Sequence, residues 1–202
     1  MALEAFPVID TAHLTQRHPL PVWAPRSSLG RKDINGNVWA WFNPASIVWR
    51  GKRWLAYRTE CSPRWHWSRV SLAELNDAFD VIPGTNTLLN LQTQYGGWGA
   101  EDPRLIVHED RLFLSYSDGA RVGLAELDED GTVIRSKLFA KNAVMKIPAL
   151  HKDDREKSWG FFSAQGRLFI VYWTSPHIVF AYDQGRRKLG SRWETEWNVP
   201  AS

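Results

Sequence analysis

The chain repeats itself, and this self-similarity constrains its fold more than any other feature of the sequence. Three segments align: NPASIVWRGKRWLAYR (43–58), DPRLIVHEDRLFLSYS (102–117) and SWGFFSAQGRLFIVYW (158–173). Each carries a tyrosine thirteen residues after its second position, and these tyrosines are spaced by 59 and then 56 residues. A period in this range is typical of architectures built from one repeated supersecondary unit. The three tyrosines are Tyr57, Tyr116 and Tyr172.

Each segment has the pattern of a β-hairpin. Apolar and polar residues alternate, β-branched and aromatic residues are frequent, and a short polar turn divides two runs. The expected turns are Gly51-Lys52, Glu109-Asp110 and Gln165-Gly166. A third strand-like run follows each hairpin, at SRVSLAEL (68–75), ARVGLAEL (120–127) and HIVFAYD (177–183).

The connections between the units are long enough for one more strand each. Residues 76–100 and 128–157 would hold a fourth, outer strand and the return to the next unit. Four-stranded units arranged radially are the blades of a β-propeller. The sequence therefore predicts an all-β fold, one propeller-like domain over residues 1–202. Its units would cover approximately 39–90, 98–145 and 152–190, with 1–38 as a strand or cover.

Three units are fewer than a closed propeller contains, because rings usually have 4–8 blades. The alternatives are a shortened propeller, part of a longer one, or a ring completed by partner chains, for example in a homo-oligomer. In each case the innermost strand of a blade begins at the central cavity. We therefore expect Asn43-Pro44, Asp102-Pro103 and Ser158-Trp159 to lie around one shared site.

Composition narrows the function. The chain has 202 residues, is 44% hydrophobic and carries a formal charge of +3 without a basic block, which gives no indication of nucleic-acid binding. The longest apolar run, Leu168–Trp173, is too short to cross a bilayer, and Met1–Asp10 has no signal-peptide pattern. A single cysteine, Cys61, excludes an internal disulfide and suits a reducing compartment, so we expect a cytoplasmic protein.

Tryptophan is unusually frequent, with twelve residues. Its flat apolar face suits the C–H faces of sugar rings as well as core packing. The candidates for stacking on a sugar are Trp41, Trp98, in a glycine-rich loop before Glu101, and Trp159, at the start of the third unit. Core packing is the alternative for all three.

The residues at the blade starts resemble those of the five-bladed β-propellers of glycoside hydrolase family 130. That family contains β-mannoside phosphorylases and related hydrolases. The resemblance covers Trp39 to about Tyr182, or about three of five blades. Its motifs are Asn43-Pro44 with Tyr57-Arg58, Glu101-Asp102-Pro103-Arg104 and Glu156-Lys157-Ser158-Trp159. The third motif departs from the family, which has an aspartate or asparagine after the lysine.

The resemblance implies that an aspartate acts as general acid and that basic side chains hold an attacking phosphate. Asp102 is then the catalytic acid, and inorganic phosphate would be a co-substrate, with no other cofactor. The implied phosphate-binding residues are Arg58, Arg104, Arg121, His151, Lys157 and His177. Apart from the resemblance, Asn43, Glu101, Trp98 and Trp159 are candidate substrate-binding residues because they lie at or beside the blade starts.

The chemistry agrees with this assignment. Cleavage with inversion needs a proton for the leaving oxygen and a nucleophile on the opposite face of the sugar. Adjacent residues of an extended strand point to opposite faces, so we expect only one of Glu101 and Asp102 to reach the cavity. Asp102 is favoured because it occupies the register of Asn43 in the preceding repeat. A structural alternative also exists, with Asp102 capping a turn and Glu101 pairing with an arginine.

The first hypothesis is therefore an inverting glycoside phosphorylase or hydrolase acting on β-mannoside-like glycosides. The alternatives are a non-catalytic propeller that binds an oligosaccharide and an assembly module completed by partner chains. No metal site is expected, because the acidic residues Asp153, Asp154 and Glu156 match no metal-binding loop.

Overall fold

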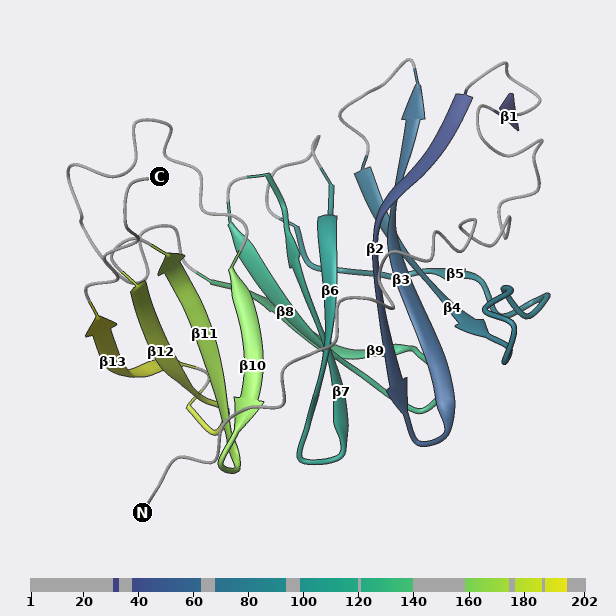
Figure 1. Ribbon diagram of the computed structural model, residues 1–202. Helices are drawn as coiled ribbons and strands as arrows, with labels where there is room; N and C mark the ends of the chain where they lie inside the picture. Colours follow the sequence, from purple (N-terminus) through teal and green to yellow (C-terminus); the bar gives the residue numbers. More distant parts are fainter. Residues whose placement is uncertain are drawn as a thin grey trace, which may run out of the picture.

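A computed structural model describes residues 31–32, 38–62, 68–93, 99–119, 121–139, 159–174, 177–186 and 188–195. Within these ranges every helix or strand assigned is a β-strand, and the strands form three antiparallel sheets (Figure 1). The predicted all-β fold is confirmed. The described residues include no helix of the length and apolarity that a membrane span requires.

The sheets follow one another along the chain and are called blades 1, 2 and 3. Blade 1 consists of β1 (Arg31–Lys32), β2 (Val38–Trp49), β3 (Lys52–Ser62), β4 (Ser68–Leu75) and β5 (Thr87–Leu88). Blade 2 consists of β6 (Glu101–His108), β7 (Arg111–Ser117), β8 (Val122–Leu127) and β9 (Val133–Leu138). Blade 3 consists of β10 (Gly160–Ala164), β11 (Arg167–Thr174), β12 (His177–Asp183) and β13 (Lys188–Thr195).

The first hairpin of each blade closes with a two-residue turn in which both residues have positive φ. This geometry matches the twist of the flanking strands and explains the glycines and polar residues at these positions. The turns are Arg50-Gly51, Glu109-Asp110 and Gln165-Gly166. The first lies one residue earlier than the sequence pattern predicts, because Lys52 pairs with Trp49 and already belongs to β3. All three turns lie at the same end of the molecule, the bottom in Figure 1.

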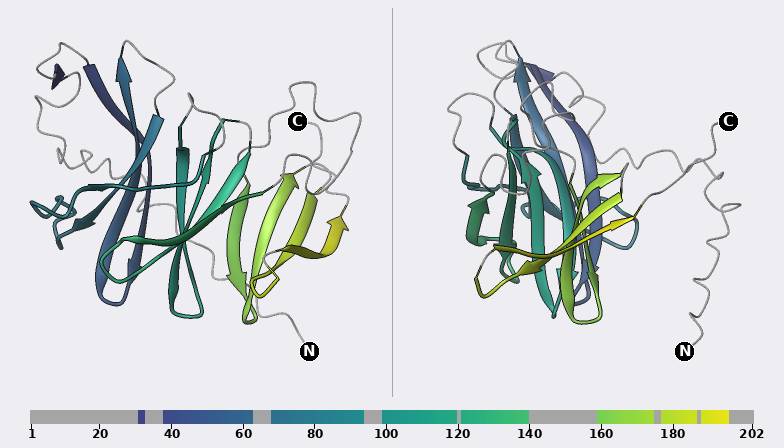
Figure 2. Two further views of the ribbon diagram at one scale, coloured as in Figure 1. Left: turned by 180° about the vertical axis from the view of Figure 1, so that it is seen from behind. Right: turned by 90° about the vertical axis from the view of Figure 1, so that its left-hand side faces the viewer.

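The blades stand side by side with their first hairpins aligned. Strand β6 contacts both β2 and β10, so the leading hairpin strand of blade 2 lies between those of its neighbours (Figures 1 and 2). In each blade the outer strands follow in order away from this row. The arrangement is a propeller-like array of three blades.

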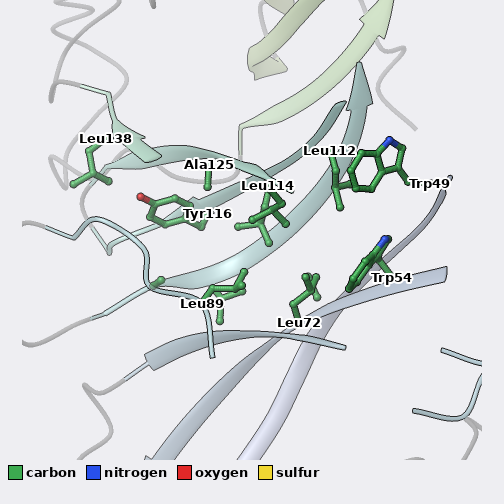
Figure 3. Close-up of a cluster of buried hydrophobic side chains, with 13 residues drawn as sticks. Trp49, Trp54, Leu72, Leu89, Leu112, Leu114, Tyr116, Ala125 and Leu138 are labelled. Carbon is green, nitrogen blue, oxygen red and sulfur yellow. The ribbon is translucent and has the colours of Figure 1, made fainter. Parts of the chain in front are cut away.

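Alternation along the second strand gives each blade two apolar faces. We call the face toward the following blade the leading face and the other the trailing face. Trp54 of blade 1 lies on a leading face and packs with Leu114 and Tyr116 from the trailing face of blade 2 (Figure 3). All three are nearly fully buried. Full burial of one large apolar side chain contributes about 1.5–3 kcal/mol, so this interface is a major part of the core.

The same positions form the next interface. Phe113 on the leading face of blade 2 packs in a second cluster with Ile170 and Tyr172 from the trailing face of blade 3. Phe113 lies 59 positions after Trp54, and Tyr172 lies 56 positions after Tyr116, so each pair has the same role in consecutive blades. The repeat in the sequence is thus a repeat of blade-to-blade packing.

Candidate functional site

The site begins with a repeated backbone irregularity. Asn43 in β2 and Asp102 in β6 have φ values of 51° and 53°, and each lies at a shift in strand register. A proline follows each of them, at Pro44 and Pro103, and proline has no N–H to donate to the strand ladder. Asparagine and aspartate tolerate positive φ better than most residues. The Asn-Pro and Asp-Pro pairs therefore produce the same bulge in two consecutive blades.

These two bulges bring Asn43 and Asp102 together. The Asn43 Nδ2 donates a hydrogen bond of 2.5 Å to Asp102 Oδ1, joining the inner strands of blades 1 and 2. The expected convergence of these two blade starts is confirmed. The third, Ser158, lies outside the described residues.

Arg58 of β3, in blade 1, contacts the carboxylates of both Glu101 and Asp102 in blade 2. Its Nη1 lies 2.8 Å from Glu101 Oε2 and 3.5 Å from Asp102 Oδ1. Its Nε donates a 2.8 Å hydrogen bond to Ser68 Oγ at the start of β4. The Arg58 and Glu101 side chains are only 17% and 13% exposed, so water screens their ion pair weakly. Arg58 is held in place from three directions.

The expectation that only one of the two adjacent acids faces the site is wrong. Both Glu101 and Asp102 reach the same nitrogen of Arg58. The argument from strict alternation fails because the positive φ of Asp102 and the register shift that follows Glu101 interrupt the extended strand. Glu101 is committed to an ion pair with Arg58, as the structural alternative proposed.

Asp102 is the more open of the two carboxylates. Its side chain is 29% exposed, and Oδ1 accepts from both Asn43 and Arg58. Within the described part of the chain, Oδ2 has no protein hydrogen-bond partner. One oxygen is therefore fixed by the protein while the other is available to a ligand.

Two further residues predicted to bind phosphate are arginines whose guanidinium groups make few polar contacts among the described residues. Arg104 follows the bulge on β6 and is exposed, and no ion pair to it is found among the described residues. Arg121 directly precedes β8, whose Val122 pairs with the same Ser117 that pairs with Glu101. Arg121 thus lies at the same end of blade 2 as the acids.

The Arg121 backbone is hydrogen-bonded to Asp118, whereas the Nε of its side chain has no partner among the described residues. Its N–H donates 2.8 Å to Asp118 Oδ1, and its carbonyl accepts 2.9 Å from the Asp118 N–H. The Arg121 Nε is buried and has no hydrogen-bond partner. A buried donor without a partner is rare in proteins and calls for a ligand or water as an explanation.

The structure places Trp159 in the core. It is 3% exposed and packs between Phe139 and Tyr172, with ring centroids 5.3 Å and 5.2 Å away. Little ring face remains for a sugar, and the residue instead fills the interface of blades 2 and 3. The other candidates, Trp98, His151 and Lys157, lie outside the described residues.

Two members of the site were not anticipated. Ser68 orients Arg58, and Asp118, which is fully buried, fixes the turn before β8. Ser68 begins the third run of blade 1, so only its position in the repeat could have indicated it. Asp118 precedes Gly119, a typical turn pair, but a turn signal alone does not predict burial beside a candidate site.

Comparisons with known proteins give a likeness of fold. No protein-family model matches the chain, and no curated protein matches it by sequence. An α-L-arabinofuranosidase from Lactobacillus brevis aligns with TM-score 0.54 and 14% identity over 85% of this chain and 60% of that chain. A family 117 glycoside hydrolase from Zobellia galactanivorans aligns with TM-score 0.51 and 12% identity over 77% and 53%. A mannose phosphorylase from Leishmania mexicana, in complex with phosphate ion, aligns with TM-score 0.42 and 15% identity over 81% of this chain and 45% of that chain.

The chain spans 60% and 53% of the length of the first two structures. At such identities the likeness establishes the fold alone, and the more specific resemblance to family 130 stays a prediction. The fold of this chain is similar to that of propeller-type glycoside hydrolases.

Proposed function

We propose that the protein acts on glycosides, as an inverting glycoside phosphorylase or hydrolase for β-mannoside-like substrates, with Asp102 as general acid. The observation that carries the proposal is the state of the Asp102 carboxyl. Oδ1 is held by Asn43 and Arg58, while Oδ2 has no described protein partner and the side chain is partly exposed. A proton on Oδ2 would face a leaving glycosidic oxygen.

The charge around Asp102 is compatible with this role. Arg58 is the closest cation, and its positive charge is already balanced by Glu101 at 2.8 Å. A neighbouring carboxylate favours the protonated form of an acid, whereas an uncompensated cation opposes it. The Arg58–Glu101 pair therefore supports the site geometry without adding a net positive charge beside the acid.

The reaction needs a nucleophile on the face of the sugar opposite the acid. Asp102 Oδ2 donates its proton to the leaving oxygen, the glycosidic bond breaks, and phosphate or water forms the new bond at the anomeric carbon. Arg104 and Arg121 are the described residues with uncommitted guanidinium donors at this end of blade 2. Arginine holds phosphate through two parallel hydrogen bonds, which makes phosphate the favoured nucleophile.

The test compares wild type with Asp102→Asn on a panel of disaccharides, whose sugar leaving groups need a proton, including a β-mannoside and an α-L-arabinofuranoside. Each is assayed with and without inorganic phosphate. We expect the wild type to release a sugar 1-phosphate only when phosphate is present, and Asp102→Asn to lose turnover while still binding the sugar. Asp110→Asn, an exposed acid at the opposite end of blade 2, is the matched control. Near-full activity of Asp102→Asn would refute the assignment.

A second function has one observation in its favour. Of the two adjacent acids, Glu101 is bound to Arg58, which leaves a single open carboxylate in the described site. Hydrolysis with inversion requires a second carboxylate to activate water. A protein that binds oligosaccharides without cleaving them fits this arrangement. Calorimetric binding of an oligosaccharide with no product at any phosphate concentration would favour this alternative.

A further inference from the structure

Ser68 of β4 is a point of contact between blades 1 and 2 beside the candidate site. Its hydroxyl accepts a 2.8 Å hydrogen bond from Arg58 Nε. Its carbonyl accepts from the Ala100 N–H at 3.1 Å and from Arg69 Nη1 at 2.9 Å. Ala100 directly precedes Glu101, the first residue of β6, and Ser68 is only 1% exposed. One buried serine of blade 1 therefore holds both the cation of the site and the backbone that leads into the two acids.

Gly99 approaches Ser68 so closely that no side chain fits between them. It forms an isolated parallel bridge with Ser68 and has a φ of 71°. A Cβ on Gly99 would lie 1.8 Å from the Ser68 carbonyl oxygen and 2.7 Å from Arg69 Nη1. By contrast, a Cβ on Gly84, with a φ of 85°, would meet no described atom within 4 Å beyond its chain neighbours. Gly84 serves its backbone conformation alone, whereas Gly99 also permits the close approach of two blades.

These contacts close a ring of interactions around the acids. The ring runs from Ser68 Oγ to the Arg58 guanidinium. This group reaches Glu101 at 2.8 Å and Asp102 at 3.5 Å. The ring returns along the backbone to Ala100, whose Cα lies within about 8 Å of the Asp102 Cα because two peptide units join them. A displacement at Ser68 is therefore passed to the acid over a short path.

The Ser68 hydroxyl sets the orientation of the Arg58 guanidinium. The guanidinium is planar, so a fixed Nε places its Nη atoms in a defined plane. Without the hydroxyl, Glu101 at 2.8 Å attracts the guanidinium more strongly than Asp102 at 3.5 Å. The contact with Asp102 is then the first to lengthen. Asp102 Oδ1 would depend more on its hydrogen bond from Asn43, and the direction of Oδ2 would be less well defined.

We propose that Ser68 and Gly99 are positioning residues for the Asp102 acid. Ser68 acts through Arg58, and Gly99 acts through the backbone that enters β6. Neither is placed to touch a substrate, since both are buried. The proposal rests on the proposed function, because it takes Asp102 as the proton donor to the leaving oxygen.

The first test compares the leaving-group dependence of Ser68→Ala with that of wild type in the presence of phosphate. The substrates are a disaccharide, whose leaving sugar needs a proton, and the dinitrophenyl glycoside of the same sugar, whose phenolate leaves without one. We expect kcat on the disaccharide to fall at least about tenfold with KM little changed, because a misplaced general acid loses part of its effect. The kcat on the dinitrophenyl glycoside should be retained. A purely structural loss would lower both.

Ser71→Ala is the matched control for the hydroxyl. Ser71 lies on the same strand, is 3% exposed and shares a 3.1 Å hydrogen bond with Thr59 Oγ1. This variant removes one buried hydroxyl outside the ring of contacts, so we expect kcat on both substrates to be unchanged.

Gly99→Ala tests the backbone connection, and Gly84→Ala is its control. Both variants place a Cβ at positive φ, but only Gly99→Ala creates the clash with Ser68. Gly99→Ala should show the same selective loss on the disaccharide, and Gly84→Ala should not. Urea unfolding verifies that the variants are folded. If Gly99→Ala does not fold, Ser68→Ala decides the proposal.

A second readout does not depend on turnover. The Asn43 side-chain amide donates to Asp102 Oδ1, so its NMR signals report the position of that carboxylate. We expect these signals to shift in Ser68→Ala and to stay in place in Ser71→Ala. A wild type that cleaves no glycoside would refute the proposed function, while this comparison would still decide whether Ser68 positions the carboxylate.

Three results would overturn the proposal. The first is an unchanged kcat of Ser68→Ala on the disaccharide. The second is an equal loss of kcat on the two substrates, which would make the role of Ser68 purely structural. The third is a set of Asn43 side-chain signals that responds to Ser71→Ala as strongly as to Ser68→Ala.

Discussion

Asn43 and Asp102 lie 59 residues apart in the chain and are joined by one hydrogen bond, from Nδ2 to Oδ1 at 2.5 Å. They occupy the same position in consecutive repeats, with almost the same φ and a proline after each. A repeated fold thus places an amide donor against a carboxylate at the contact of two blades. The repeat conserves the backbone bulge, while the exchange of Asn for Asp makes the pair complementary.

The first prediction concerns this complementarity. Asn43→Asp places two carboxylates where a donor met an acceptor, so we expect the free energy of unfolding at neutral pH to fall by about 1–2 kcal/mol. Urea unfolding of wild type and variant at neutral pH measures the difference. Asn43→Gly, which keeps the positive φ, reports the loss of the side chain alone; equal stabilities of Asn43→Asp and wild type at neutral pH would contradict the contact.

The second prediction concerns the ion pair of Arg58. Arg58→Met removes the cation that lies 2.8 Å from Glu101, whose side chain is only 13% exposed, and so weakens the compensation of a largely buried charge. We expect a loss of about 2–4 kcal/mol in the free energy of unfolding. The matched control is Arg53→Met, because Arg53 pairs with Asp77 at the surface, and such pairs contribute about 0–1 kcal/mol. Losses of equal size in the two variants would show that the Arg58 site is not specially buried.

The blades could be predicted from the sequence because two local signals agree. Alternation and turn residues locate the hairpins, and the spacing of Tyr57, Tyr116 and Tyr172 gives the repeat. Strands β4 and β12 have the predicted bounds, while β8 begins at Val122, two residues later than expected, because Asp118 and Arg121 form a hydrogen-bonded turn. The convergence of Asn43 and Asp102 follows from the same spacing.

The contacts within the site could not be predicted from the sequence, because they depend on local backbone geometry and on neighbours distant in the chain. The shared contact of Glu101 and Asp102 with Arg58 requires a positive φ that period-two alternation does not include. The burial of Trp159 depends on Phe139, whose position after β9 no motif specifies. Composition identifies tryptophan as a candidate for stacking but does not say which rings the blades enclose.

The third prediction tests the packing between β7 and β8, the two middle strands of blade 2. A Cβ at Gly123 would lie 2.2 Å from Cζ of the buried Tyr116, whose hydroxyl donates 2.7 Å to the Gln92 carbonyl. Gly123→Ala therefore forces the ring to move, and we expect a loss of about 2–3 kcal/mol. Gly160→Ala, with a contact of 3.6 Å to Val171, is the matched control and should be neutral or stabilising. Thermal or urea unfolding of both variants measures this, and an unaffected Gly123→Ala would refute the close contact.

His108 is the buried histidine at the interface of blades 2 and 3. It is 2% exposed, its Nδ1 lies 2.8 Å from Ser163 Oγ of blade 3, and its Nε2 lies 3.8 Å from Glu109 Oε2. Burial lowers the pKa of His108; the nearby Glu109 opposes this shift and Arg111 adds to it. The neutral imidazole is thus the form that the folded protein favours.

The fourth prediction follows from the sign of this shift. Because the pKa of His108 is lower in the folded than in the unfolded chain, the unfolded chain binds more protons between the two values. Stability contributed by neutral His108 is complete above the unfolded pKa of about 6.5 and is lost as pH falls toward the folded value. We expect the unfolding free energy of wild type to decrease more steeply below that pH than that of His108→Gln, which keeps a partner for Ser163 but does not titrate. Urea unfolding from roughly pH 8 to pH 5 compares the two slopes. Equal slopes of unfolding free energy against pH in the two proteins would contradict a lowered pKa of His108 in the folded state.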